Sequence, residues 1–320
     1  MTYAEVLRIV VILFALSVTC SSQICHDMKQ VRKLIAPTRP HWVGDAFNVY
    51  PIFNNLAFTD ELSPFLMLDY AAPKEFKPTT KKLGVGQHPH RGFETVTIAL
   101  QGEVEHGDSE GNRDVIGAGD VQWMTAASGI IHEEFHSTEF AKKGGTFEMI
   151  QLWVNLPAKD KMTKPRYQAI LKDSIVVVPL PDGAGEVRII AGEYESAKGP
   201  ASTFTPINVW DVRLKAGASS ELVMPAGHRT VLFVRKGTLK VGNAADKGHV
   251  GMAQAAVLTD DGTTLSLENV GTEDCAFMIL GGEPLNEPIA ARGPFVMNTD
   301  RELQQAMADY QSGRMGSHFN

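Results

Sequence analysis

TVTIALQGEVE, residues 95–105, is the stretch that decides the expected fold. Its β-branched and apolar residues lead into Gly102 and a second short run follows, which is typical of two antiparallel strands joined by a glycine turn. A shift of 135 residues places TVLFVRKGTLK, residues 230–240, over this stretch with glycine on glycine. At a shift of 134, GAGDVQWMT (117–125) lies over GMAQAAVLT (251–259). An internal repeat of this kind predicts two similar β units in tandem.

The chain beyond residue 40 continues as short β-type runs between glycine and proline residues. Its 29 Gly and 17 Pro provide the punctuation that many turns require. The clearest runs are 94–100, 145–156, 175–178, 187–191 and 231–234. We therefore expect an all-β protein of two barrels or sandwiches, because closure or double packing removes exposed sheet edges. The boundary is expected near 191–205, where Gly, Ser and Pro collect, and one helix is expected at 300–311 after a Thr299 cap.

Length and composition favour a folded protein of two domains. The 320 residues are 43% apolar, which is enough to fill two cores. A formal net charge of −7 argues against a general nucleic-acid or anionic-membrane surface, because phosphate binding needs clustered Lys and Arg. The dense basic run of Lys29, Arg32, Lys33 and Arg39 is expected to be a solvated face or an irregular arm. Only Cys275 lies beyond residue 27, so no disulfide can form within the main body.

The N-terminus decides the expected compartment. Residues 9–18, IVVILFALSV, have the length of a signal-peptide core and are too short to span a bilayer, so stable membrane insertion is not expected. The flanks support a signal only weakly, since Glu5 offsets Arg8 and no clear cleavage site follows. We favour translation from Met28, which predicts a cytoplasmic protein. A genuine leader over 1–27 predicts an exported or periplasmic one.

Two pairs of side chains indicate a metal site. His88 and His90 are separated by one residue, as are His132 and Glu134. Side chains at i and i+2 of a strand point to the same face, so each pair can present two ligands to a barrel interior. Two such pairs on neighbouring strands supply three nitrogens and one oxygen and leave open positions on an octahedral ion. A lone His-x-His is often incidental, and a structural zinc site is usually closed and rich in cysteine.

The repeat provides an internal comparison for this site. Val223 and Pro225 stand in the second half where the first histidine pair stands, while Ser266 and Glu268 stand at the positions of the second pair. The second barrel is therefore expected to hold no metal. A duplication with function kept in one copy explains this pattern, although so few identities also allow chance.

Four motifs together resemble those of the pirin family: HPHRGFETVT (88–97), GDVQWMTAASGIIHEE (119–134), QLWVNLP (151–157) and GPFVMNT (293–299). The first two also resemble the two general cupin motifs. The resemblance covers about residues 28–313 and leaves the leader outside, which favours the later start.

The resemblance implies a bicupin, meaning two tandem cupin β-barrels, with a short C-terminal helix. The N-terminal metal-binding cupin domain would span 28–190, and the C-terminal cupin domain without metal would span 205–313. The implied metal is Fe(II) or Fe(III), with Cu, Ni, Mn or Zn as alternatives. The implied metal ligands are His88, His90, His132 and Glu134.

Four neighbouring residues are expected to have other roles. Glu94, a ligand in many cupins, is expected to be a strand residue bonded to a loop. Glu133 should face away from Glu134 by strand alternation. His136 is expected at the pocket rim or surface, and His106 is expected to be exposed after a turn.

The resemblance implies an iron-dependent dioxygenase of the quercetin 2,3-dioxygenase type, acting on a flavonol-like small molecule with Glu134 as general base. The alternative is a non-enzymatic, iron-dependent regulator that binds a protein partner, as a transcriptional cofactor or a modulator of a metabolic enzyme, without direct nucleic-acid contact. A cupin isomerase or storage protein is a third, weaker interpretation, because no motif marks a sugar or phosphate site. The residues leave the substrate, the partner and the oligomeric state open.

Overall fold

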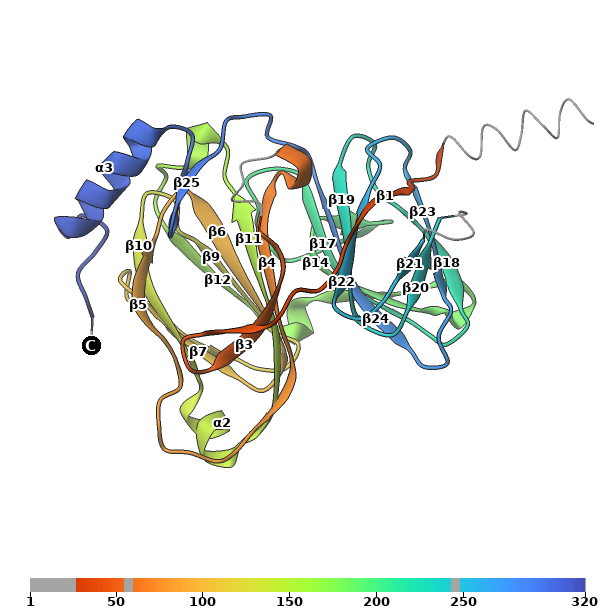
Figure 1. The fold of residues 1–320 in the computed structure, drawn as a ribbon, viewed down its shortest axis with the longest axis horizontal. Helices are drawn as coiled ribbons and strands as arrows, with labels where there is room; N and C mark the ends of the chain where they lie inside the picture. Colours follow the sequence, from red (N-terminus) through yellow and green to blue (C-terminus); the bar gives the residue numbers. More distant parts are fainter. Residues whose placement is uncertain (1–26, 55–59, 243–247, 320) are drawn as a thin grey trace, which may run out of the picture.

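Two β-barrels lie side by side in this chain, as Figure 1 shows. The structure is a computed structural model that describes residues 27–54, 60–242 and 248–319. It confirms the predicted all-β fold of two tandem barrels followed by a C-terminal helix.

The first barrel is built from a seven-stranded and a four-stranded antiparallel sheet. The larger sheet contains, in spatial order, β12 (Arg166–Ile170), β9 (Val121–Thr125), β6 (Phe93–Gln101), β11 (Gly145–Asn155), β4 (Phe65–Phe76), β3 (Phe47–Asn54) and β2 (His41–Val43). The smaller sheet contains β5 (Gly84–His90), β10 (Ile130–His136), β7 (Val104–Asp108) and β8 (Arg113–Ile116).

The second barrel repeats this arrangement. Its larger sheet contains, in spatial order, β1 (Val31–Ile35), β22 (Gln254–Leu258), β19 (Arg229–Lys236), β24 (Cys275–Gly282), β17 (Ile207–Leu214), β14 (Gly185–Ala191) and β13 (Val176–Pro179). Its smaller sheet contains β18 (Ser219–Val223), β23 (Thr264–Asn269), β20 (Leu239–Val241) and β21 (His249–Val250).

The repeat found in the sequence is a repeat of structure. β6 lies between β9 and β11, and β19 lies in the same way between β22 and β24. The aligned turn residues Gly102 and Gly237 have φ angles of +80° and +84°, a region that only glycine adopts readily. The glycine turn is therefore a shared feature of both units.

The remaining elements are short, apart from one helix. They are β15 (Glu193–Tyr194), β16 (Ala197–Lys198), β25 (Ala290–Arg292), β26 (Phe295–Met297), η2 (Asp60–Leu62), η3 (Ala158–Asp160), η4 (Lys172–Ser174), η5 (Pro181–Gly183) and α2 (Thr138–Lys143). The longer helix α3 (Asp300–Gln311) begins as predicted after Thr299, whose side chain accepts a hydrogen bond from the Glu302 amide.

The sheets exchange segments across the predicted domain ranges 28–190 and 205–313. β1, β13 and β14 belong to the larger sheet of the second barrel, although they lie within the first range. The segment with β25, β26 and α3 returns to the first barrel, where Phe295 forms a β-bridge with Arg91 (Figure 1). Each barrel therefore contains or contacts a segment from the sequence range predicted for the other barrel.

The prediction of a solvated face is confirmed for Arg32, Lys33 and Arg39 of the basic run, which are exposed, and is wrong for Lys29. Lys29 is fully buried, and its ammonium group donates to the backbone carbonyls of His228, Thr259 and Asp260. The next residues form β1, which pairs with β22. This long-range pairing gives the segment a partner that its own composition does not reveal.

The two larger sheets pack against each other through a shared apolar core. This core contains Val96, Ile98 and Leu152 of the first barrel beside Val231 and Phe233 of the second. Because side chains alternate along a strand, the other face of β6 and β11 lines the interior of the first barrel. That interior is where the predicted ligands lie.

Within the described ranges, no helix is long and apolar enough to cross a membrane. The apolar run 9–18 lies outside those ranges, as does the proposed leader apart from Asp27. The choice between a Met28 start with a cytoplasmic location and an exported protein stays a prediction.

Candidate metal centre

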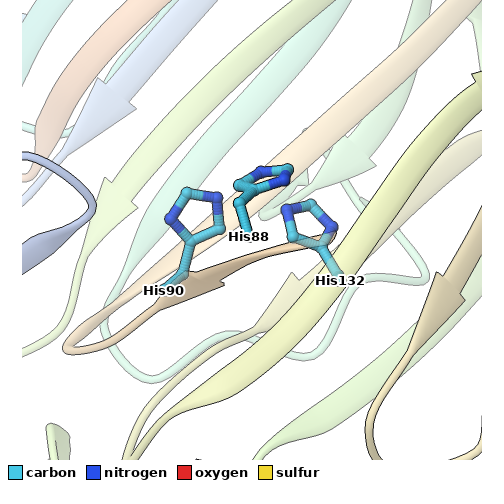
Figure 2. A group of neighbouring side chains, drawn as sticks. All are labelled: His88, His90 and His132. Atoms are coloured by element: carbon cyan, nitrogen blue, oxygen red, sulfur yellow. The ribbon is translucent and has the colours of Figure 1, made fainter. Parts of the chain in front are cut away.

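Three of the four predicted ligands meet inside the first barrel. His88 and His90 project from β5 with the i, i+2 spacing expected, and His132 on β10 is the direct cross-strand partner of His88. Figure 2 shows the three imidazoles gathered on these neighbouring strands. One ring nitrogen of each lies within 4.8 Å of those of the other two. This is a group that could hold a metal ion.

The surroundings of these imidazoles fit a metal ion. His132 is fully buried, and neither of its ring nitrogens has a hydrogen-bond partner in the described part of the chain. Burial lowers the pKa of His90 and His132 well below the usual histidine value, and the neighbouring His88 lowers both further. A lowered pKa favours the neutral form of the His90 and His132 rings, which is the form that binds metals. Buried donors without partners are otherwise uncommon in folded proteins.

The backbone has special features next to the ligands on β5 and on β10. The pairing of β10 with β5 changes register between His132 and Glu134. After β5, Gly92 adopts a φ of +90°, and a Cβ there would lie 1.9 Å from the Val296 carbonyl oxygen. The buried ammonium group of Lys161 donates to the carbonyls of both Gly92 and Val296. These contacts hold the chain just beyond His90 in a single position.

Glu134 lies beside the three histidines but outside the group of mutually close nitrogen atoms. Its Oε1 accepts a hydrogen bond from Thr97 Oγ1 at 2.9 Å and from Gln122 Nε2 at 3.4 Å. Among the described residues, Oε2 has no such partner. Glu134 as the fourth ligand stays a prediction.

A pocket of about 280 Å³ opens beside these residues between the two sheets of the first barrel. This volume is near the lower end of the range for small-molecule sites. Its lining is mostly apolar and consists of Val43, Phe47, Val49, Met67, Asp69, Val85, His88, His90, Glu134, Met149, Gln151 and Trp153. The Trp153 and His90 rings meet edge to face, with their centroids 5.3 Å apart. An apolar, aromatic-walled pocket with few polar groups suits a small aromatic ligand.

Comparison with known sequences identifies the family. The family pattern for Pirin matches residues 46–154, and that for the Pirin C-terminal cupin domain matches residues 209–316. The chain belongs to the pirin family. Its two barrels are accordingly the tandem cupin domains of a pirin.

Several relatives resemble this pirin over most of its length. A Pseudomonas aeruginosa protein, assigned by inference as a quercetin 2,3-dioxygenase, is 53% identical over 287 residues, which cover 90% of this chain and 98% of that protein. The human protein named Pirin is 36% identical over 256 residues, covering 80% and 83%. The crystal structure of quercetin 2,3-dioxygenase from Acinetobacter baumannii superimposes with a TM-score of 0.86 at 50% identity, covering 91% and 99%.

Two carboxylates near the ligands of this pirin behave largely as predicted. Glu133 faces away from the pocket, where Lys82 and Gln87 bind its carboxylate. Glu94 is buried and accepts a hydrogen bond from Thr125 Oγ1 at 2.7 Å, and burial raises its pKa to about 7. Its partner is on the neighbouring strand β9 and not on a loop, because β6 and β9 are paired at this point.

Two histidine predictions were wrong. His106 is fully buried, because β7 pairs with β10 and its ring stacks on Tyr167 at 4.8 Å. Its Nε2 is bonded to Asp108, and its Nδ1 accepts from Gln122 Nε2 at 3.1 Å. The His106 ring is therefore linked to Glu134 through Gln122, which donates a hydrogen bond to each of them.

His136 is also buried and does not lie at the pocket rim or on the surface. Its ring packs among Phe47, Phe76, Phe140 and Phe147. Burial lowers its pKa to about 4. An imidazole in this aromatic cluster is part of the core.

The second barrel has an apolar interior, and its expected lack of metal stays a prediction. Its core includes Leu222, Met224, Leu232 and Phe277. Within the described ranges, the histidine group of the first barrel is the only cluster of at least three potential metal ligands.

The sequence reasoning missed Asp69, which lines the pocket from the larger sheet. A signal was present, since Asp69 is the one charged residue in the apolar run FLMLDYAA at 65–72. A charge inside a buried strand indicates either a partner or a role in binding.

Proposed function

We propose that this pirin is an iron-dependent dioxygenase of the quercetin 2,3-dioxygenase type, with one iron ion held by His88, His90, His132 and Glu134. The observation that carries the proposal is the group of three close imidazoles, above all that of the buried His132, whose ring nitrogens have no hydrogen-bond partner among the described residues. The names of the similar Pseudomonas and Acinetobacter proteins support the reaction class. Imidazole and carboxylate donors with open positions suit iron that works with dioxygen.

The residues of the pocket have distinct tasks in this proposal. A bound iron ion supplies Lewis acidity and the electron chemistry that dioxygen requires. Glu134 accepts the proton of a substrate hydroxyl at Oε2, since Oε1 already accepts hydrogen bonds from Thr97 and Gln122. Apolar walls that include Phe47 and Trp153 orient an aromatic ring and reduce the water around it.

Metal analysis followed by a flavonol assay tests the proposal. The chain from Met28 onward is purified as wild type, His88→Ala and Glu134→Ala, and each sample is analysed for iron before aerobic incubation with quercetin. We expect about one iron per chain in the wild type with loss of the quercetin chromophore, and loss of both properties in His88→Ala. Turnover that survives removal of the metal contradicts this mechanism.

A non-enzymatic regulator is the second candidate, and one contact favours it. Arg91 directly follows His90, and its guanidinium binds Asp309 of α3 at 2.7 Å. The ligand-bearing strand is thereby tied to a helix on the outside of the barrel (Figure 1). A pull-down with reduced and with oxidised iron protein tests this role. A partner retained in one state supports it, and no partner in either state argues against it.

A further inference from the structure

A polar row crosses the larger sheet on the pocket side of the first barrel. In cross-strand register it runs from Gln122 through Thr97 and Gln151 to Asp69. Gln122 and Thr97 both donate to Glu134, and Thr97 also lies 2.8 Å from Gln151 Oε1. Adjacent strands are about 4.8 Å apart, so Asp69 lies roughly 10 Å from Thr97 along this row. The row thus leads away from the predicted metal ligands to a carboxylate.

Asp69, which is half-buried, differs from the buried carboxylates of this barrel. Glu94 is bonded to Thr125, and Glu148 is bonded to Tyr70. By contrast, no hydrogen bond or ion pair joins the Asp69 carboxylate to another residue within 27–54, 60–242 or 248–319. Burial raises the pKa of Asp69 to about 6, while His41 acts in the opposite direction. Asp69 is half-buried, so its carboxylate is partly desolvated without the hydrogen bonds that normally offset this cost.

The position of Asp69 defines what could provide the missing hydrogen bond. It lines the pocket from the larger sheet, whereas His88 and His90 line it from the smaller sheet. A ligand that reaches both must extend across the pocket between apolar walls. An ionised carboxylate only accepts hydrogen bonds, so the ligand group beside Asp69 is a hydroxyl or another donor. A carboxylate or phosphate on the ligand would instead be repelled.

We propose that Asp69 is a specificity-determining residue, which accepts a hydrogen bond from a hydroxyl on a second ring of an aromatic ligand whose first ring lies beside the histidine group. This assignment rests on the proposed function for the choice of a flavonol as ligand. It separates polyhydroxylated ligands from flavonols that have an unsubstituted second ring. Gln151, the neighbour of Asp69 in register, lies beside the same part of the ligand.

Binding of two flavonols to the iron-loaded full chain, measured by calorimetric titration without oxygen, tests the assignment. The probes are quercetin and 3,5,7-trihydroxyflavone. The second ring is the pendant phenyl ring, which carries two hydroxyls in quercetin and none in 3,5,7-trihydroxyflavone. The variants are Asp69→Leu, which removes the acceptor, and Asp69→Asn, which keeps the shape. Glu75→Gln is the matched control, because Glu75 is an exposed carboxylate on the same strand and contacts Thr146.

We expect Asp69→Leu to weaken quercetin binding by roughly 10- to 100-fold, as for a hydrogen bond to a charged group, and Asp69→Asn to weaken it less. Binding of 3,5,7-trihydroxyflavone should change by less than about threefold, with the iron content equal in all samples. An equal loss for both flavonols, or wild-type protein that does not prefer quercetin, overturns the assignment. Selective binding without aerobic turnover supports Asp69 and counts against the dioxygenase. Aerobic turnover without selective binding supports the dioxygenase and counts against the role of Asp69.

Discussion

Replacing Asp69 with asparagine should stabilise the protein, and the gain should depend on pH. Asp69 faces a mostly apolar pocket and has no hydrogen-bond partner among the described residues, so its ionised form is disfavoured in the fold. Its pKa is about 6 in the folded protein against 3.8 for the free side chain. Asparagine has nearly the same shape and does not ionise. The substitution therefore removes the half-buried charge while keeping the packing.

The size of the effect follows from the pKa difference. Each pKa unit corresponds to about 1.4 kcal/mol, so the shift sets an upper value of about 3 kcal/mol. Partial exposure of Asp69 to the pocket reduces this to about 2 kcal/mol. Between pH 3.8 and about 6 the folded state binds more protons than the unfolded state, so wild-type stability falls as the pH rises through this window. The advantage of Asp69→Asn should be smallest near pH 4 and complete by about pH 7.

Thermal unfolding of both proteins from about pH 4.5 to pH 8 measures this advantage. All other titrating groups are shared, so the difference in Tm isolates Asp69. We expect the Tm advantage of Asp69→Asn to grow by roughly 4 °C across the range. The exposed-site control Glu75→Gln should show no such growth. A Tm difference that stays constant with pH, or shrinks as the pH rises, would refute the reasoning.

Three further substitutions test the surroundings of the site. Lys161→Met leaves the buried carbonyl of Gly92 without its ammonium donor, so stability should fall by about 1–3 kcal/mol together with metal content. Thermal unfolding and metal analysis measure both, and unchanged metal content would separate Lys161 from the site. Glu94→Gln should leave the iron content unchanged in elemental analysis, whereas a clear loss would make Glu94 a ligand. His106→Leu removes the hydrogen bonds to Asp108 and to Gln122, and Gln122 is the residue that donates to Glu134. Flavonol turnover per bound iron should therefore fall roughly tenfold, and equal turnover would contradict this role.

Local periodicity explains which parts of the site were predictable. His88 and His90 had to share one face because side chains alternate along any strand, and their clustering with His132 is confirmed. The start of the C-terminal helix was predictable for the same reason, because the Thr299 cap of α3 depends only on neighbouring residues. These predictions needed no knowledge of distant partners.

The environments of other histidines depended on distant segments and could not be predicted in this way. His106 is buried because β10 and Tyr167 cover it. His136 is buried because phenylalanines from β3, β4, α2 and β11 surround it. A turn nearby in sequence indicated exposure in the first case, and tertiary packing overrode it.

By itself, the sequence determined the β class, the duplicated unit and the histidine pairs, because strand alternation and glycine turns act over a few residues. Only the tertiary structure decided that β1 joins the second barrel, that the segment around Phe295 returns to the first, and that Asp69 faces the histidines across one pocket. The reason is that periodicity specifies which face a side chain occupies. The pairing of strands far apart in the chain specifies what that face meets.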